Sequence, residues 1–392
     1  MTAHPSRRSV LGLLGAVPVA AGAAYVAGPA AATGGRTPEG LRPGGELDRF
    51  VADKAARDEF SGSLLLTHRG RTVLARSHGM ADKARGVPIG QDTAFALASV
   101  TKLTTAVAVA RLVQEGKVSH GARLGTYLDG FPDTFARITV HHLLTHTSGL
   151  GDYHGMPGYR EAAATWTSPE QVMAGITDFV RRSEPMFPPG AGFAYSNSAY
   201  HLLGEIVATV SGLSYHDYVR EHVFAKAGMT GADFVTKPEW RTGKRFAHPY
   251  HRDAQGQWVD ALEDFGYIGT PAGEAFATCA DLERFARRLY QGRLVEPAQT
   301  QLVLSGKVPM PQRMDAPPPG ARPRAVYQCY GPIGTLDGGQ WNFGHGGGNP
   351  AGIATSVEFH PGTEWVVVVL SNYADAPVQQ IVGMARDLIA RA

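Results

Sequence analysis

The sequence predicts an α+β fold, in which both ends of the chain supply strands to one antiparallel sheet flanked by helices, and a mainly helical lobe is inserted between these ends. Strand-like runs stand near the start of the folded chain, at 63–75, and near its end, at 353–372. The segments between them carry apolar residues at helical spacing. The 392 residues, 43% of them hydrophobic, suffice for a large core in one domain or in two lobes.

The first 32 residues have the layout of an export signal. Arg7 and Arg8 precede an uncharged run of Ala, Gly and Val that ends in three alanines, 30–32. The paired arginines favour the twin-arginine route, although Val10 and Gly12 depart from its usual pattern. Glycines and prolines dilute the hydrophobicity of the run, so we expect a secreted protein without a stable membrane anchor.

The charge balance of the remaining chain argues against some partners. Without the leader, 35 basic and 35 acidic residues remain, so no basic surface for nucleic acid is indicated. Cys279 and Cys329 are too few for a disulfide framework. Export would permit one bridge between them, and their pairing stays open, as does the oligomeric state.

The elements of the predicted sheet lobe lie at about 47–98 and 270–392, after a Gly- and Pro-rich stretch at 33–46 that we expect to be a flexible leader. The expected elements are an amphipathic helix at 47–57, a hairpin with strands 63–68 and 72–75, a helix capped by Thr278 and running to Leu289, strands at 353–359 and 365–372, and a final helix at 378–390. The apolar run 366–370 is typical of a strand buried on both faces.

The predicted helical lobe occupies about 99–269. An apolar helix covers 100–113, with no Gly or Pro before Gly116. A second helix opens at Ser168-Pro169, where Gln171 could close a capping box, and a third runs from 199 to 211 and is closed by Gly212. The two lobes together predict a single domain over 47–392.

Ser99 and Lys102 stand three residues apart at the start of the apolar helix, so their side chains share one face and can meet. In a dry site, an amine beside a hydroxyl can stay partly neutral and take the proton of that hydroxyl, which would make the serine a nucleophile. A helix-capping serine followed by an exposed lysine gives the same spacing. The motif alone therefore leaves both interpretations open.

Two further motifs complete the pattern: Phe-Ala-Tyr-Ser-Asn-Ser at 193–198 and Gly-His-Gly-Gly-Gly at 344–348. With them the chain resembles the serine β-lactamase and penicillin-binding superfamily, nearest the class C β-lactamases, carboxypeptidase-type DD-peptidases and related esterases. The resemblance extends over about 47–390 and recurs in the stretches 138–150, 187–190, 271–273 and 360–362. It implies the β-lactamase/DD-peptidase fold.

The resemblance also implies a role for each motif. Ser99 would be the acylated nucleophile, with Lys102 and Tyr195 as acid and base. Asn197 would hold Lys102 and the acyl side chain of the substrate. Tyr195 as a core aromatic and Asn197 as a turn residue are the plainer alternatives. The backbone N–H groups of Ser99 and Gly348 would form the oxyanion hole, and the glycines let the strand approach the ligand closely; the substrate-binding residues of this third motif would be His345, Gly346, Gly347 and Gly348.

The third motif departs from Lys-Thr-Gly in a way that bears on the substrate. His345 is mostly neutral at pH 7 and Gly346 has no hydroxyl, so recognition of a substrate carboxylate is weakened. This favours a hydrolase of esters, amides or peptides, or a transacylase with an amine acceptor. A D-alanyl-D-alanine carboxypeptidase, a penicillin-binding protein, a β-lactamase and a penicillin sensor without turnover remain alternatives.

Three histidines, His141, His142 and His146, lie close enough in sequence to raise the question of a metal. Their spacing is not that of H-E-x-x-H, and no carboxylate lies between them. We therefore expect no metal and no cofactor. The expected partner is a small-molecule or peptide substrate.

Overall fold

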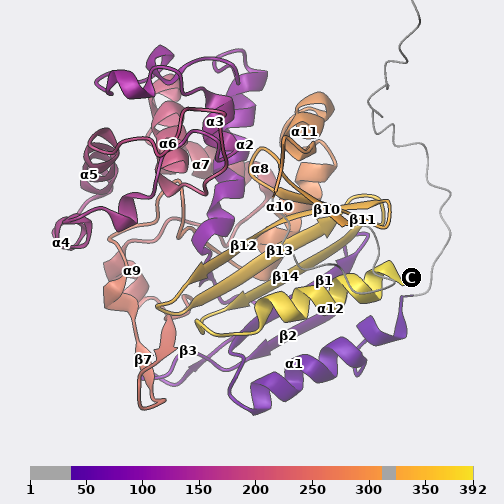
Figure 1. Cartoon of the computed structure of the whole chain (residues 1–392). Coiled ribbons are helices and arrows are strands. Elements are labelled where there is room, and N and C mark those ends of the chain that lie inside the picture. The colour runs from indigo at the N-terminus through magenta and orange to yellow at the C-terminus, as the bar shows by residue number, and fades with distance from the viewer. Residues whose placement is uncertain (1–36, 311–323, 392) are drawn as a thin grey trace, which may run out of the picture. The chain divides into compact units, whose positions relative to one another are not determined.

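The computed structural model describes residues 37–310 and 324–391, and its central feature is an antiparallel sheet with strand order β2-β1-β14-β13-β12-β11-β10-β9 (Figure 1). Both chain ends contribute to it, since β1 pairs with β14 from Gly62 opposite Ser371 to His68 opposite Trp365. The predicted α+β class is confirmed. The strands are β1 Gly62–His68, β2 Arg71–His78, β9 Val308–Pro309, β10 Arg324–Gln328, β11 Ile333–Asp337, β12 Gln340–Asn349, β13 Ile353–His360 and β14 Trp365–Ser371.

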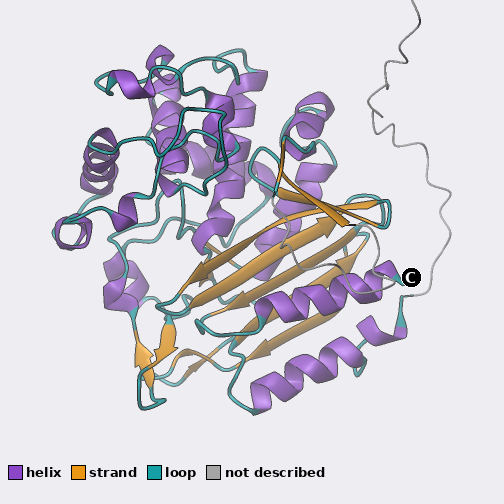
Figure 2. Ribbon diagram, in the orientation of Figure 1, coloured by secondary structure: helices purple, strands orange, loops and turns teal. Residues whose placement is uncertain are grey.

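Helices cover both faces of this sheet, and the alternation of side chains along the strands supplies a core to each face (Figure 2). On one face, Leu64 and Val367 pack in a cluster with Ile381 of α12 (Val378–Ala390), and α1 (Glu46–Ala56) adds to that cluster. On the other face, Leu65 and Val368 join the larger core that includes α10 (Cys279–Tyr290). Every residue of β14 is buried, as its apolar sequence predicts.

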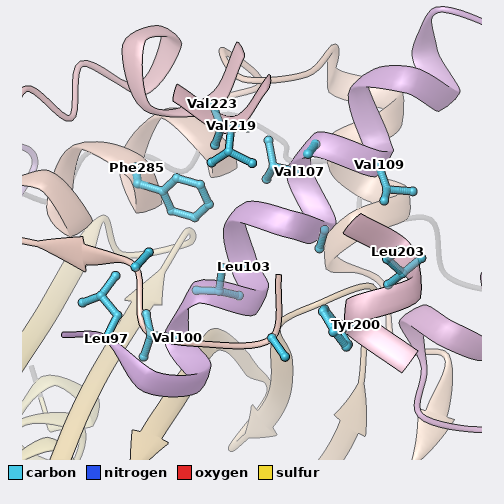
Figure 3. Close-up of a cluster of buried hydrophobic side chains, with 14 of the residues drawn as sticks. Leu97, Val100, Leu103, Val107, Val109, Tyr200, Leu203, Val219, Val223 and Phe285 are labelled. Atoms are coloured by element: carbon cyan, nitrogen blue, oxygen red, sulfur yellow. The ribbon is translucent and has the colours of Figure 1, made fainter. Parts of the chain in front are cut away.

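The helical lobe forms around α2 (Lys102–Gln114), of which ten residues are buried. Figure 3 shows Leu103 and Val107 of this helix packed between Val219, Val223 and Phe285 on one side and Leu203 of α6 on the other. The main helices of the lobe are α3 Val140–Leu144, α5 Pro169–Arg181, α6 Asn197–Ser211 and α7 Tyr215–Val219. Burial of α2 on nearly every side gives a rigid base to the residues at its first turn.

Short elements connect the two lobes and extend them. These are β3 Met80–Asp82, β4 Val87–Pro88, β5 Phe95–Ala96, α4 Tyr159–Ala163, α8 Ala225–Ala227, α9 Lys237–Thr242, β6 Tyr250–Arg252, β7 Trp258–Asp260, β8 Phe276–Ala277 and α11 Pro297–Leu304. Within the described residues no helix has the length and apolar character needed to cross a membrane. Cys279 and Cys329 are both free and buried.

Each helix and strand expected from the sequence is present within two or three residues of its predicted bounds. One capping detail was wrong. Ser168 Oγ accepts from Gln171 N as expected, but Gln171 Oε1 accepts from Thr167 N at 2.7 Å instead of closing the box on Ser168. Strands β9, β10 and β11 were not predicted, because two to five residues give too little alternation to recognise. The longer strand β12 was not among the predicted elements either, because its glycines hide the alternation.

The predicted export signal, 1–32, lies outside the described residues. The predicted flexible leader, 33–46, is wrong in its second half. Residues Glu39–Leu41 form a 3-10 turn, and Leu41 is fully buried in the cluster that contains Leu388 of α12. Gly and Pro set the turns of this stretch, but the single Leu anchors it to the folded body.

Candidate active site

Ser99 lies in a 3-10 turn, Ala98–Thr101, directly before α2, and so stands at the mouth of the helix as predicted. Ala98 has φ 44°, a left-handed conformation that is uncommon for a residue with a side chain. Two backbone hydrogen bonds to the segment 274–275 hold this turn in place: Leu97 N donates to Ala275 O, and Glu274 N donates to Ala98 O. This strained turn presents Ser99 at the end of a rigid helix.

Lys102, the first residue of α2, is fully buried. Its Nζ lies 3.1 Å from Ser99 Oγ, 2.7 Å from Asn197 Oδ1 and 2.6 Å from the Ala272 carbonyl oxygen. Burial lowers the pKa of Lys102 to about 7, and the negative charges of Glu274 and Asp152 oppose that effect. A large part of the amine is therefore neutral at physiological pH. The predicted contact with Ser99 is present.

Tyr195 reaches Ser99 from the opposite side, with its hydroxyl donating to Ser99 Oγ at 2.6 Å. Burial raises the pKa of Tyr195 well above its usual value, so the phenol keeps its proton at neutral pH. The residue is nevertheless 43% exposed, which leaves it accessible to a substrate. The ring packs against buried His146 in a tilted arrangement, with a centroid distance of 4.6 Å, and His146 Nδ1 accepts from Ser196 N. His146 thus supports the turn that carries Tyr195.

Asn197 begins α6, after the helix-capping Ser196. Its Oδ1 accepts from Lys102, and its Nδ2 donates to Asp152 Oδ2 at 2.6 Å. Sequence reasoning missed Asp152, which lies in a loop and caps the 3-10 turn Tyr153–Gly155. The available sequence signal was weak: Asp152 stands two residues before His154, whose backbone N–H needs an acceptor at the start of a turn.

The glycines of the third motif lie on β12, close to Ser99. A Cβ on Gly347 would lie 2.3 Å from the Leu97 carbonyl oxygen and 3.1 Å from Ser99 N, so only glycine allows this approach. Gly348 follows it on the same strand, paired with Ala354 of β13. The motif is thereby brought to the candidate nucleophile.

His345 of the same strand is buried, and burial together with the Lys102 charge lowers its pKa to about 4. Its ring is therefore neutral at pH 7, with Nδ1 2.6 Å from the Gly346 carbonyl oxygen. A Cβ on Gly346 would point to the other face of β12, 3.0 Å from Gln379 Nε2. Sequence reasoning missed Gln379, because only the packing of α12 brings this side chain to the motif.

Two of the three clustered histidines take part in local structure. His141 Nδ1 lies 2.9 Å from Tyr330 OH, and His142 Nδ1 accepts from Thr139 N in the cap of α3. Over 37–310 and 324–391, no group of three or more His, Cys, Asp or Glu side chains could hold a metal ion.

A serine hydroxyl between a buried lysine and a tyrosine, on this two-lobed fold, defines the class of serine hydrolases with an S-x-x-K motif. The chain belongs to the Beta-lactamase family, whose model matches residues 47–390. The predicted resemblance and fold are thereby confirmed.

The relatives of this chain are named for different activities. Penicillin-binding protein 4* of Bacillus subtilis is 30% identical over 263 residues, which cover 64% of this chain and 56% of the relative. Esterase EstB of Burkholderia gladioli is 36% identical over 245 residues, 58% of this chain and 59% of the esterase. The chain thus spans little more than half the length of these relatives. The crystal structure of a penicillin-binding protein from Bacillus halodurans superposes with a TM-score of 0.74 at 28% identity, covering 86% of this chain and 98% of that one.

Proposed function

We propose that the protein hydrolyses an ester, amide or peptide bond through an acyl-Ser99 intermediate, with Lys102 and Tyr195 as acid and base. One observation carries this proposal: the fully buried Lys102 amine lies 3.1 Å from Ser99 Oγ, and its pKa is lowered to about 7. A base whose pKa is near the working pH combines availability with strength. An exposed lysine, ionised at pH 7, could not take this proton.

In the proposed acylation, Ser99 Oγ attacks the carbonyl carbon and Lys102 Nζ takes the hydroxyl proton. The N–H groups of Ser99 and Gly348 bind the oxyanion, a contact whose loss typically reduces the rate about 10²- to 10³-fold. Tyr195 OH protonates the leaving group as its bond to the carbonyl carbon breaks, and the proton held by Lys102 replaces the one that Tyr195 gave. Water then attacks the acyl-enzyme, and the same groups act in reverse.

The proposed substrates are esters or amides without a carboxylate beside the scissile bond. Neutral His345 and the bare Gly346 offer no charge to such a carboxylate, and the 36% identity to a protein named esterase supports the choice of an ester. Relatives named penicillin-binding proteins keep a D-alanyl-D-alanine carboxypeptidase or β-lactamase as the second candidate. An amine in place of water would give a transacylase. A sensor without turnover is disfavoured, because Lys102 and Tyr195 both contact Ser99 and Asn197 contacts Lys102, so the groups proposed to activate water for deacylation are in place.

The test is to assay the purified protein with p-nitrophenyl butyrate, a chromogenic cephalosporin and a D-Ala-D-Ala peptide, and to map a fluorophosphonate adduct by mass spectrometry. We expect steady-state ester hydrolysis and the adduct on the peptide that contains Ser99. An adduct on another serine, or a stoichiometric burst without turnover, contradicts the proposal. Transfer to an added amine would identify a transacylase.

We also propose that the protein is exported through the leader 1–32. The paired arginines and the alanines at 30–32 support this proposal. Cell fractionation with mass determination of the new N-terminus tests it, and we expect secreted protein cleaved near Ala32. Uncleaved protein that accumulates in the cytoplasm contradicts it.

A further inference from the structure

Asp152 holds the Asn197 amide in one orientation. Asp152 Oδ2 accepts from Asn197 Nδ2 at 2.6 Å, while Oδ1 accepts from the backbone N and ring Nδ1 of His154. The side chain of Asp152 is 38% exposed; its partial desolvation raises the pKa, but the hydrogen bonds from His154 and Asn197 outweigh that effect and lower the pKa overall. An ionised carboxylate can only accept hydrogen bonds, so the nitrogen of the Asn197 amide must face it and the oxygen must face away.

The orientation of this amide decides where the Lys102 lone pair points. A neutral amine has two N–H donors and one lone pair. Asn197 Oδ1 and the Ala272 carbonyl oxygen are acceptors at 2.7 and 2.6 Å, and they take both donors. The lone pair is left for the third neighbour, Ser99 Oγ, at 3.1 Å. A turned Asn197 amide would instead donate to the lone pair and remove the base.

We propose that Asp152 is a positioning residue, whose carboxylate locks the Asn197 amide so that the lone pair of Lys102 faces Ser99. This inference rests on the proposed hydrolase function and adds to it a residue that is joined to Lys102 through the Asn197 amide. Asp152 acts from a loop of the helical lobe, through the first residue of α6, on the first residue of α2.

Asp152 also contributes charge to the Lys102 site. Its carboxylate and that of Glu274 both raise the pKa of Lys102 against the effect of burial. The other titratable groups around the amine are neutral or uncharged at pH 7: Ser99, His146, Tyr195, Tyr200 and His345. Removal of the Asp152 charge therefore lowers the pKa of Lys102, and the acid limb of kcat/KM moves to lower pH.

The experiment compares wild type, Asp152→Asn and Asp152→Ala with p-nitrophenyl butyrate between pH 5 and 9. Asn at position 152 has the shape of Asp and can still cap the His154 turn, so this variant should fold. Its amide oxygen accepts from His154 N in that cap, and its NH₂ group therefore faces the Asn197 amide in place of an acceptor. We expect kcat to fall about 10- to 100-fold in both variants, with KM changed less than about threefold. The acid limb of the remaining activity should lie at lower pH than in wild type.

Glu274→Gln is the matched control. It removes the other carboxylate that acts on Lys102 but leaves the contact between Asp152 and the Asn197 amide, so the acid limb should move to lower pH while kcat on the plateau falls less than in Asp152→Asn. Asp152→Asn with wild-type kcat overturns the proposal, as does a loss of kcat without displacement of the acid limb. A fluorophosphonate adduct on wild-type Ser99 separates these outcomes from failure of the function itself, which would leave wild type unlabelled.

Discussion

The two faces of β12 border regions of opposite character. On the face of the sheet that α1 and α12 cover, the buried cluster consists of aliphatic and aromatic side chains in ordinary strand and helix conformations. On the face toward Ser99, a lysine is fully buried, and Ala98, His146 and Glu274 have positive φ. In the described part of the chain, His146 Nε2 has no hydrogen-bond partner. A non-glycine residue in that conformation costs about 1 kcal/mol or more.

This difference shows that the residues that stabilise the fold and the residues of the candidate active site lie on different faces of the sheet. On the apolar face, burial of aliphatic and aromatic side chains holds α12 against the sheet, and the buried ion pair between Glu358 of β13 and Arg386 of α12 adds to that contact. The Ser99 face retains a desolvated amine and strained turns, which reactivity needs and folding does not. A substitution should therefore affect either activity or stability according to the face on which it lies.

The largest expected effect is on the Ser99 face. Ser99→Ala removes the nucleophile, so kcat for ester hydrolysis should fall about 10⁴-fold or more, because residues that act as one unit lose their effect together. The free energy of unfolding, measured in urea, should change by less than about 0.5 kcal/mol. Activity that survives in Ser99→Ala would contradict the assignment of the reactive face to Ser99.

The opposite face gives the reverse result. Ile381 of α12 is fully buried in the apolar cluster. Ile381→Ala leaves a cavity there and should lower the free energy of unfolding by about 2 to 5 kcal/mol. We expect kcat of the folded variant at 20 °C to equal that of wild type, measured below the unfolding transition. A large fall in kcat would show that the two faces are coupled.

The third motif sharpens the comparison, because its residues point to both faces of β12. His345→Lys with Gly346→Thr should shift kcat/KM toward carboxylate-bearing β-lactams or D-Ala-D-Ala peptides, relative to neutral esters, by about 10- to 150-fold, the worth of one charge-assisted hydrogen bond. The added Thr meets the flexible end of Gln379, so Gln379→Ala in the same background is the matched control. A wild type that already prefers cephalosporins to neutral esters contradicts this interpretation.

The smallest expected effect is a gain in stability. Lys102 has a pKa of about 7 in the folded protein against 10.5 as its reference, so between these values only the unfolded chain takes the proton and stability rises with pH. Lys102→Met should abolish activity and stabilise the fold by about 1 to 2 kcal/mol at pH 6. The gain should shrink as pH rises toward 10. Urea unfolding at both pH values measures it, and a gain independent of pH would show that the buried charge is not its cause.

Local chemistry determined much of what the sequence could predict. The periodicity of 100–113, the capping residue Thr278 and the closing Gly212 each act within a few residues of their own position, so the corresponding helices were predictable. The pairing of Ser99 with Lys102 is also local, since three residues separate them. His345 was predicted to be neutral from its type alone, and burial makes it more so.

Contacts between distant parts of the chain were decided only by the tertiary structure. The acceptors of Lys102 lie 95 and 170 residues away, and Asp152 and Gln379 reach the motifs from a loop and from the last helix. No spacing rule encodes such contacts, because the hydrogen bonds depend on where two lobes bring their loops together. The sequence by itself determined which reactive groups the chain carries, and the packing determined the dry environment of the Lys102 amine and its orientation beside Ser99.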